Sequence, residues 1–502
     1  MSQRSEKARS GAQVENVRTS KRGTRIVTTN PWKSLGKGAS ILLVFILWPA
    51  LCIAQTNDLT AKVLTLEDAM NYALQHYPAV RASLEQVSAA RAGVTLARTQ
   101  YLPQLSGVYQ ASRATQNQVN GIWLPTPITP TVIGPIGSSS GQSFWSSQAA
   151  AFFSWEPLDF GLRSARVGQA RSAEDKSQAD LDLTQLQVAT AVGNYFLVAV
   201  ANEQAVVAAQ ANVDHWQVLN NSIHVLVDNQ LRPGVDGSRA DAELARAKAQ
   251  LYQAQQAERV ALDTLASLMG TAGSEIQLDG GPLLDLPQTA SLLESSVSDH
   301  PLSRNQMASV RQVQAEEKIE QRSDYPRLFV QAEGLARGSG VPNNGSIIGN
   351  WNGAAPARGN WVTGITILFP DVFVFKARSA EEQISKANER SEQAHYDQTI
   401  QDLTGQTRSA RDQLKGAELI ARETPIELAA ARQSETQSRT RYQSGLTTIA
   451  EVAEAENLLA QAEMDDAIAR LNVWRGLFGV AYAQGNLQTF LQVLHRSAPG
   501  DH

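Results

Sequence analysis

Cysteine is almost absent from this chain of 502 residues, which contains one, Cys52. Aromatic residues make up only 6% of the sequence and charged residues 19%. A single thiol excludes an internal disulfide, and so few aromatic side chains argue against a thick globular core. Hydrophobic residues still reach 42%, and long stretches are rich in Ala, Gln, Glu and Arg. This composition favours long helices that pack through small side chains.

Motifs for catalysis and cofactor binding are also missing from the sequence. The seven histidines show no i,i+4 pairing and no HExxH arrangement. The segment Gly270–Gly273 is followed by neither the Lys nor the Ser/Thr of a phosphate-binding loop. We therefore expect no catalytic residue, no metal site and no cofactor, and a secreted hydrolase has no residues to support it.

The N-terminus has the features of a secretory leader. Basic residues are spread over Arg4–Lys37, an apolar run follows at 41–48, and small residues occur at 52–54. The apolar run is shorter than the ~20 residues of a membrane span, which disfavours the alternative of a retained anchor. Leu51 stands where a lipidation signal needs a small residue. We expect a signal peptide over 1–54 rather than lipidation of the cysteine.

Removal of the leader changes the charge of the chain. Residues 1–54 hold nine Lys/Arg and two Glu, so the formal net charge of −5 becomes −12. An acidic chain does not suit nucleic acid, because affinity for nucleic acid comes largely from basic contacts to phosphate. No later segment looks apolar and long enough to cross a bilayer as a helix. Any membrane crossing is therefore expected to use strands.

An internal repeat organises the rest of the chain. Pro78 and Pro103 bound one helical stretch and lie 25 residues apart, and Pro301 and Pro326 bound another with the same separation. The two copies are offset by 223 residues. In both, an alternating run, a Gly/Pro-rich loop, a second alternating run and a long Ala/Gln/Glu-rich region follow in the same order. The duplication is the strongest feature of the sequence.

Each repeat is expected to contain two strands, a long helix, a turn and a second helix. The expected domains are a first repeat over 55–289, a second repeat over 290–485 and a C-terminal tail over 486–502. In the first repeat we expect strands 104–113 and 146–155, helices 162–229 and 238–269, and a turn at 230–238. In the second we expect strands 327–336 and 361–369, helices 376–443 and 449–480, and a turn at 444–448. Pro425 should kink or locally unwind the long helix of the second repeat.

The strand candidates alternate as membrane strands do. One face of strand 146–155 is made by Ala149, Ala151, Phe153 and Trp155. Gln148 and Ser154 lie on the opposite face. Each candidate has about the 9–11 residues that a tilted membrane strand requires. The alternatives are a water-soluble hairpin that caps a coiled coil, and a free-standing coiled-coil rod.

Four strands cannot close a barrel, and open sheet edges are not tolerated in lipid. The chain must therefore oligomerise if these strands lie in a membrane. Three copies would supply twelve strands, and cyclic homo-oligomers are the usual solution.

The sequence resembles the TolC family of outer-membrane efflux proteins over about residues 64–485. The resemblance rests on the leader, the duplicated order of elements, the strand exit Pro157-Leu158-Asp159-Phe160-Gly161, and the turn segment Tyr442–Ala455. It implies a mainly α fold with a membrane β-barrel, in which a trimeric 12-stranded β-barrel is continued by a 12-helix coiled-coil α-barrel. The implied location is the outer membrane of a Gram-negative bacterium, with a long periplasmic extension.

The function implied by the resemblance is passive export in a tripartite efflux or type I secretion system. The implied partners are two further copies of the chain, a periplasmic adaptor, an inner-membrane pump of RND, ABC or MFS type, and outer-membrane lipid. A periplasmic coiled-coil adaptor or scaffold without a pore is the alternative function.

The resemblance also implies roles for individual residues. Acidic residues expected around the periplasmic aperture are Glu451, Glu454 and Asp241. Residues expected in adaptor-docking turns are Gly234, Val235, Gly445, Leu446 and Thr447. Residues of the strand-exit motif are Pro157, Phe160, Gly161, Pro370 and Phe373. The first turn is about one residue longer than the second, so its acidic position falls on Asp241 or is lost to Ala240. Both turn glycines are expected where a positive φ is useful.

Overall fold

The computed structural model describes residues 63–115, 141–287, 295–341, 346–348, 350–370 and 375–497. The chain divides into a unit of Met1–Asn57 and a unit of Asp58–His502, and the fold described below belongs to the second unit. The expected signal peptide at 1–54 and Phe373 of the strand-exit motif lie outside the described residues.

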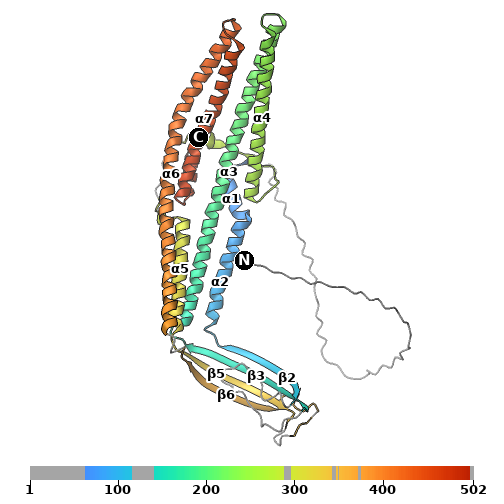
Figure 1. Ribbon diagram of the computed structural model, residues 1–502, viewed down its shortest axis with the longest axis vertical. Coiled ribbons are helices and arrows are strands. Elements are labelled where there is room, and N and C mark those ends of the chain that lie inside the picture. Colours follow the sequence, from blue (N-terminus) through green and yellow to red (C-terminus); the bar gives the residue numbers. More distant parts are fainter. Residues whose placement is uncertain are drawn as a thin grey trace, which may run out of the picture. The chain divides into compact units, whose positions relative to one another are not determined.

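The elements follow one another in the duplicated order. The first copy consists of α2 (Pro78–Thr99), β2 (Gln104–Thr115), β3 (Ser143–Leu158), α3 (Leu162–Asp228) and α4 (Gly234–Met269). The second consists of α5 (Pro301–Ser323), β5 (Arg327–Ser339), β6 (Arg358–Leu368), α6 (Phe375–Gln443) and α7 (Ile449–Ala483) (Figure 1). The smaller elements are β1 (Val63–Leu64), α1 (Leu66–His76), β4 (Gln277–Leu278), η1 (Gly281–Leu284), η2 (Val297–Asp299) and α8 (Gln488–Ser497).

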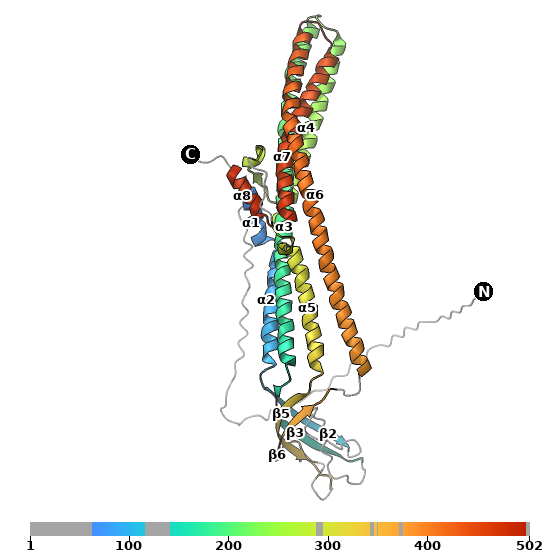
Figure 2. The same ribbon diagram turned by 90° about the vertical axis from the view of Figure 1, so that its left-hand side faces the viewer.

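The helices form a layer that continues from the strands. Next to the sheet the neighbours are α2, α3, α5 and α6, and at the other end α3 pairs with α4 and α6 with α7 (Figures 1 and 2). Helix α6 runs through Pro425 without interruption, so the expected local unwinding is wrong. The adjacent Thr424 is buried and donates a hydrogen bond to Asp466 of α7, at 3.2 Å. Packing against α7 outweighs the backbone hydrogen bond that the proline cannot make.

A compact core forms where α1, α3, α7 and α8 meet. Trp474 and Phe478 of α7 meet Phe490 of α8 edge-to-face, with ring centroids 5.9 and 5.2 Å apart. A Cβ added at Gly193 of α3 would lie 2.4 Å from the Phe478 ring, so only glycine permits this approach. The residues 488–497, expected to be part of a C-terminal tail, thus form a packed helix. The parallel pairing of β1 with β4 is likewise an addition to the expected elements.

Helix α3 has one window apolar enough to cross a membrane by composition, with a mean hydropathy of 1.3. Half of this window is buried within the protein. The expectation that no segment after the leader would reach such hydropathy is therefore wrong. The reason is that α3 carries core residues such as Phe196 and Val200, which pack in the cluster shared with α1 and α7.

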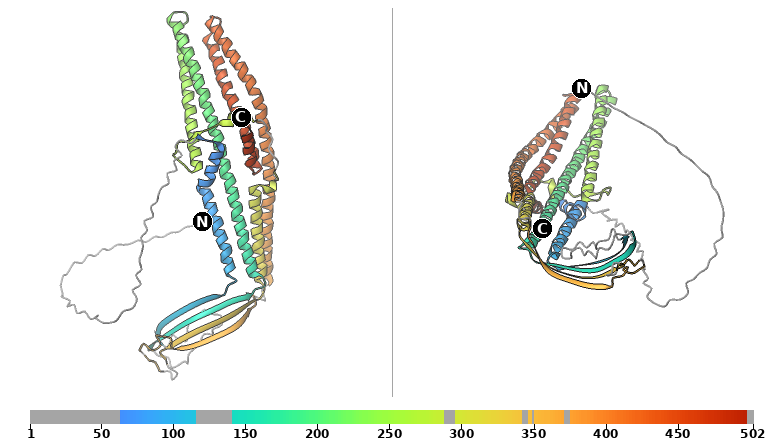
Figure 3. Two further views of the ribbon diagram at one scale, coloured as in Figure 1. Left: turned by 180° about the vertical axis from the view of Figure 1, so that it is seen from behind. Right: turned by 60° about the horizontal axis from the view of Figure 1, so that its bottom comes forward.

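The four long strands form one antiparallel sheet in the order β2-β3-β5-β6 (Figure 3). Strand β3 is longer than the expected 146–155, and its pairing with β5 is irregular between Trp155 and Leu158. Only β2 and β6 have an edge without a strand partner in the described chain. The sheet therefore has two open edges in a single copy.

Candidate functional site

One face of the four-stranded sheet is apolar across all its strands. The pairing register aligns Phe153 of β3 with Leu105 of β2 and with Ala332 of β5. Farther along, Trp155 pairs with Val330, which pairs with Ile365 of β6. These cross-strand rows confirm the expected alternation, because apolar residues from all four strands lie on the same side.

The apolar face is exposed in a single copy of the chain. The exposed fractions are 76% for Leu105, 80% for Trp361 and 70% for Ile365. The opposite face is polar: Ser112 and Ser146 hydrogen bond at 2.9 Å, and Thr366 donates to Gln331 Oε1 at 3.3 Å. A continuous apolar face of this kind marks a contact with lipid or protein.

The strand exit positions α3 at a fixed angle to the sheet. Asp159 accepts hydrogen bonds from the backbone of Gly161 at 3.1 Å and of Arg163 at 2.6 Å. Its carboxylate also forms a buried ion pair with the Arg163 guanidinium, at 2.9 Å. Phe160 and Gly161 have φ of 50° and 98°, so the chain turns sharply here. The motif's Pro157 lies within β3 and Pro370 follows β6. The Asp159–Arg163 pair was not predicted, although its i,i+4 spacing on an exposed sequence motif could have suggested it.

The turn between α6 and α7 has the expected left-handed glycine. Gly445 has a φ of 77°, and the Leu446 amide donates to Arg441 O at 2.9 Å. This arrangement closes the C-terminus of α6. Leu446 is 69% exposed, but Thr447 is buried at 8%. Of these two residues, Leu446 is therefore the one that a partner could touch.

The turn between α3 and α4 differs from the expected one. Helix α4 already begins at Gly234, and the left-handed residue is Gln230, with a φ of 60°. The expected turn at 230–238 is thus too long, and the expectation of a positive φ at Gly234 is wrong. Pro233 precedes the helix with a φ of −66° and sets its direction, which removes the need for a flexible glycine. Val235 in the first turn of α4 is 70% exposed.

The two turns are joined by a polar contact. The Tyr442 hydroxyl of α6 donates a hydrogen bond to Asp236 Oδ2 of α4, at 3.0 Å. Arg232 donates to the Tyr442 carbonyl oxygen and lies over the Tyr442 ring, 4.3 Å from its centroid. Burial, together with the hydrogen bond to Asp236, raises the pKa of Tyr442 to about 12. The hydroxyl therefore stays a donor throughout the physiological range.

The three acidic residues expected at the aperture have different surroundings. Glu451 and Glu454 are exposed on α7. Asp241 of α4 accepts hydrogen bonds from Asn220 at 2.8 Å and from His224 at 2.9 Å. The hydrogen bonds from Asn220 and His224 lower the pKa of Asp241. Asp241 is thus tied to α3 of its own hairpin, whereas the two glutamates remain open to solvent in one copy.

A buried carboxylate just beyond these residues was not predicted. Glu456 of α7 is 2% exposed, and its Oε2 lies 3.7 Å from His215 Nδ1 of α3. Burial, followed by the neighbouring Glu435 of α6, raises the pKa of Glu456 to about 7. The sequence gives little signal for this residue, because Glu456 lies in a helix rich in exposed glutamate.

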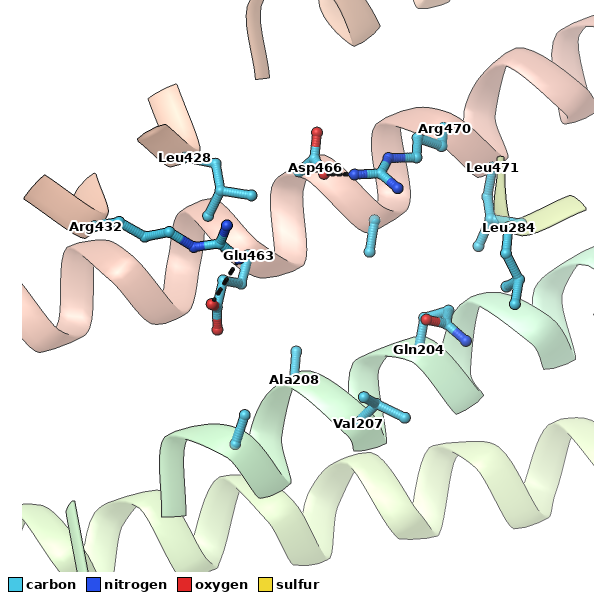
Figure 4. Close-up of a pocket in the computed structure, with 12 residues that line it drawn as sticks. Gln204, Val207, Ala208, Leu284, Leu428, Arg432, Glu463, Asp466, Arg470 and Leu471 are labelled. Carbon is cyan, nitrogen blue, oxygen red and sulfur yellow. Dashed lines mark hydrogen bonds and ion pairs between the residues drawn. The ribbon is translucent and has the colours of Figure 1, made fainter. Parts of the chain in front are cut away.

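A cavity of about 310 Å³ opens between α3 and the α6–α7 pair, with Leu284 of η1 at one end (Figure 4). Its charged residues pair with one another: Arg432 with Glu463 at 3.3 Å, and Arg470 with Asp466. The described residues contain no cluster of His, Cys, Asp or Glu that could hold a metal ion.

Comparison with known proteins relates both halves of the chain to one family. A family model described as outer membrane efflux protein matches residues 69–271 and 292–480. The pyoverdine export outer membrane protein OpmQ of Pseudomonas aeruginosa is 24% identical over 421 residues, 82% of each chain. Protein CyaE of Bordetella pertussis is 26% identical over 275 residues, and this chain spans 53% of its length.

The fold is shared with solved outer-membrane channels. The CmeC outer membrane channel of Campylobacter jejuni matches with a TM-score of 0.67 and 15% identity, over 86% of this chain and 89% of that one. The MtrE outer membrane channel of Neisseria gonorrhoeae matches with a TM-score of 0.65 and 18% identity, over 84% and 89%. Together with the family model that matches both repeats, the duplicated helix–sheet architecture shows that this chain belongs to the outer membrane efflux protein family, the TolC-type channels of the outer membrane.

Proposed function

We propose that three copies of this chain form a duct that conducts substrates passively across the outer membrane. The observation that carries the proposal is the four-stranded sheet, which has one exposed apolar face and open edges at β2 and β6. An unpaired edge leaves backbone groups without partners in lipid. Pairing β6 of one copy with β2 of the next satisfies both edges, and a closed ring of three copies contains twelve strands.

The apolar face also argues against a water-soluble adaptor or scaffold. Trp361 and Ile365 are 80% and 70% exposed, and their neighbours on the face are apolar as well. Pairing further strands to the edges of the sheet would not cover this face. Lipid covers it in the proposed barrel, with the polar face turned toward the lumen.

We place the entry to the duct at the two helical turns. Val235 and Leu446 project there with 70% and 69% exposure, which suits contact with the tip of a periplasmic adaptor's helical hairpin. Glu451 and Glu454 lie on α7 just after the second turn, and in a trimer they would contribute six carboxylates near the mouth. Such a ring favours cations over anions. The Tyr442–Asp236 contact would hold the two hairpins of one copy together.

The direction and energy of transport would come from an inner-membrane pump of RND, ABC or MFS type. The relative OpmQ is a pyoverdine export protein, which supports small-molecule export as one role for this chain. We assign the choice of cargo to the pump, because the duct itself is lined by water. The leader at 1–54 would direct the chain to the periplasm and be removed there.

The proposal is tested with the full chain, extracted in detergent from the outer membrane of a Gram-negative host. Native mass spectrometry should give the mass of a trimer, and planar bilayers should show discrete conductance steps. A monomer that stays soluble without detergent and conducts no current would leave the adaptor or scaffold alternative standing instead.

A further inference from the structure

A groove with a volume of about 760 Å³ lies between α3 and α5, beside the strand exit. Small residues such as Gly168 leave space for it. Its walls carry four cations: Arg171 of α3, and Arg311, Lys318 and Arg322 of α5. No carboxylate lines it. The groove is therefore a concentrated positive site in a protein whose net charge is negative.

The cations of this groove lack anionic partners. Within the described ranges, Arg171, Arg311 and Lys318 form no ion pair. The nearest acidic residues are engaged elsewhere, since Glu389 accepts from Gln314 at 2.8 Å and Asp182 pairs with Arg304 at 3.8 Å. The cavity of Figure 4 is different, because its arginines face glutamate and aspartate. Unneutralised like charges repel one another, and an anion bound between them would relieve this repulsion.

Exposed aromatic rings mark the end of the groove nearest the sheet. Phe160 lines the groove and stacks on Tyr325, with ring centroids 6.1 Å apart. The two residues are 47% and 45% exposed, and Arg322 lies over the Tyr325 ring at 5.5 Å. Aromatic residues of membrane proteins gather at the level of the lipid headgroups. This end of the groove therefore lies at headgroup depth, and Arg311, eleven residues before Arg322, lies about 16 Å deeper along the helix.

The groove opens on the side of the helical layer that carries α1 and α8. Residues 18 apart point in the same direction on a straight α-helix. Gly168 and Arg171 precede Leu186 and Ala189 by this interval, and both of the latter belong to the core that includes α1. Figure 2 shows α1 and α8 on one side of the layer. Elements packed on that side would obstruct a lumen, so under the proposed function, on which this step rests, the groove faces outward.

We infer that the groove binds the phosphate diester headgroup of an anionic phospholipid in the periplasmic leaflet of the outer membrane. Guanidinium groups bind phosphate oxygens in bidentate fashion, and basic pockets beside membrane segments suit lipids that carry phosphate. Four cations spread over roughly 16 Å match diphosphatidylglycerol, which has two phosphates, better than phosphatidylglycerol. The exposed Phe160 and Tyr325 favour a lipid over a free anion, because the acyl chains would leave the groove beside them.

Native mass spectrometry of the delipidated full chain tests this inference and the trimer in one spectrum. The chain is titrated with diphosphatidylglycerol, phosphatidylglycerol and zwitterionic phosphatidylcholine, each in neutral detergent, and with inorganic phosphate as a competitor. The test variant combines Arg171→Gln, Arg311→Gln and Lys318→Gln. A control variant combines Lys248→Gln, Arg408→Gln and Lys415→Gln, which removes the same charge from exposed positions of α4 and α6.

The wild type and the control variant should bind diphosphatidylglycerol most tightly and phosphatidylcholine least. A surface Lys or Arg contributes about a factor of five to the binding of an anionic lipid. The test variant should therefore lose on the order of 100-fold in affinity for diphosphatidylglycerol. Equal binding by the test and control variants would overturn the inference, as would displacement of the lipid by stoichiometric inorganic phosphate. Trimers without lipid adducts would refute the groove alone, whereas lipid-bound monomers would refute the duct alone.

Discussion

The Tyr442 hydroxyl donates to Asp236 Oδ2 at 3.0 Å, which ties the end of α6 to the beginning of α4. The two residues are far apart in sequence and belong to different repeats. Their contact is the side-chain hydrogen bond that joins the ends of the two helical hairpins within one copy. A change in this contact should therefore alter how far the hairpins can separate.

We expect Tyr442→Phe to loosen the periplasmic end of the duct. A hydrogen bond contributes about 0.5–1.5 kcal/mol, so its removal should shift an equilibrium between joined and separated hairpins by roughly 2–10-fold. Single-channel recording in planar bilayers should show a larger mean conductance. Tyr252→Phe on α4, where the tyrosine is 64% exposed, is the matched control and should leave conductance unchanged. An unchanged conductance in Tyr442→Phe would mean that this contact does not limit the aperture.

The buried Glu456 should make the stability of the helical hairpins depend on pH. Its pKa is raised to about 7, above the ordinary value of 4.5, chiefly by burial. The folded chain therefore holds this proton more tightly than the unfolded chain does, and stability should fall as pH rises from about 4.5 to about 7. The loss should amount to a few kcal/mol.

Glu456→Gln should remove this pH dependence and stabilise the protein at pH 8. The measurement is urea denaturation of the detergent-solubilised chain from pH 5 to pH 8, followed by circular dichroism. Glu451→Gln is the control, because Glu451 is exposed on the same helix. Parallel pH profiles for wild type and Glu456→Gln would show that Glu456 is ionised without penalty in the folded protein.

The two faces of β6 should tolerate a charge very differently. Ile365→Arg places a cation on the apolar face, where arginine near the middle of a bilayer costs about 2–4 kcal/mol. Thr366→Arg places it on the polar face, beside Gln331. Fractionation of cells should show less outer-membrane protein for Ile365→Arg and a near-normal amount for Thr366→Arg. Equal recovery of the two variants would argue against lipid contact at Ile365.

The two turn glycines should respond differently to substitution. Gly445 has a φ of 77°, so Gly445→Val places a branched residue in a left-handed conformation and costs roughly 1–2 kcal/mol or more. It should abolish export while leaving trimers intact, if the turn docks an adaptor. Gly234 is already helical, so Gly234→Ala should be neutral or stabilise α4 by up to about 1 kcal/mol. Undiminished export by Gly445→Val would remove the docking role of that turn.

Periodicity predicted the long elements well, because each has an uninterrupted pattern and a proline or glycine near its ends. The alternation in 146–155 shows which side chains share a face, and the observed register extends that alternation across four strands. The left-handed position of the second turn could also be predicted, since Gly445 is the one glycine between two long helical patterns.

Features decided by contacts between distant segments were missed. The helix at 488–497 is short, and its stability comes from burial of Phe490 against Trp474 and Phe478. Local sequence suggested Gly234 as the flexible residue of the first turn, but the chain turns at Gln230 and Pro233 directs the next helix. The burial of Glu456 likewise depends on three helices that approach one another only in the folded chain.

The open edges at β2 and β6 also constrain the biogenesis of the protein. A solitary copy cannot enter the bilayer without exposing unpaired backbone groups to lipid, so insertion requires other copies to be present at the same time. Below a threshold concentration in the periplasm, the chain should wait in a form shielded by a chaperone or be degraded. The yield of inserted protein should thus rise with a power of expression level greater than one.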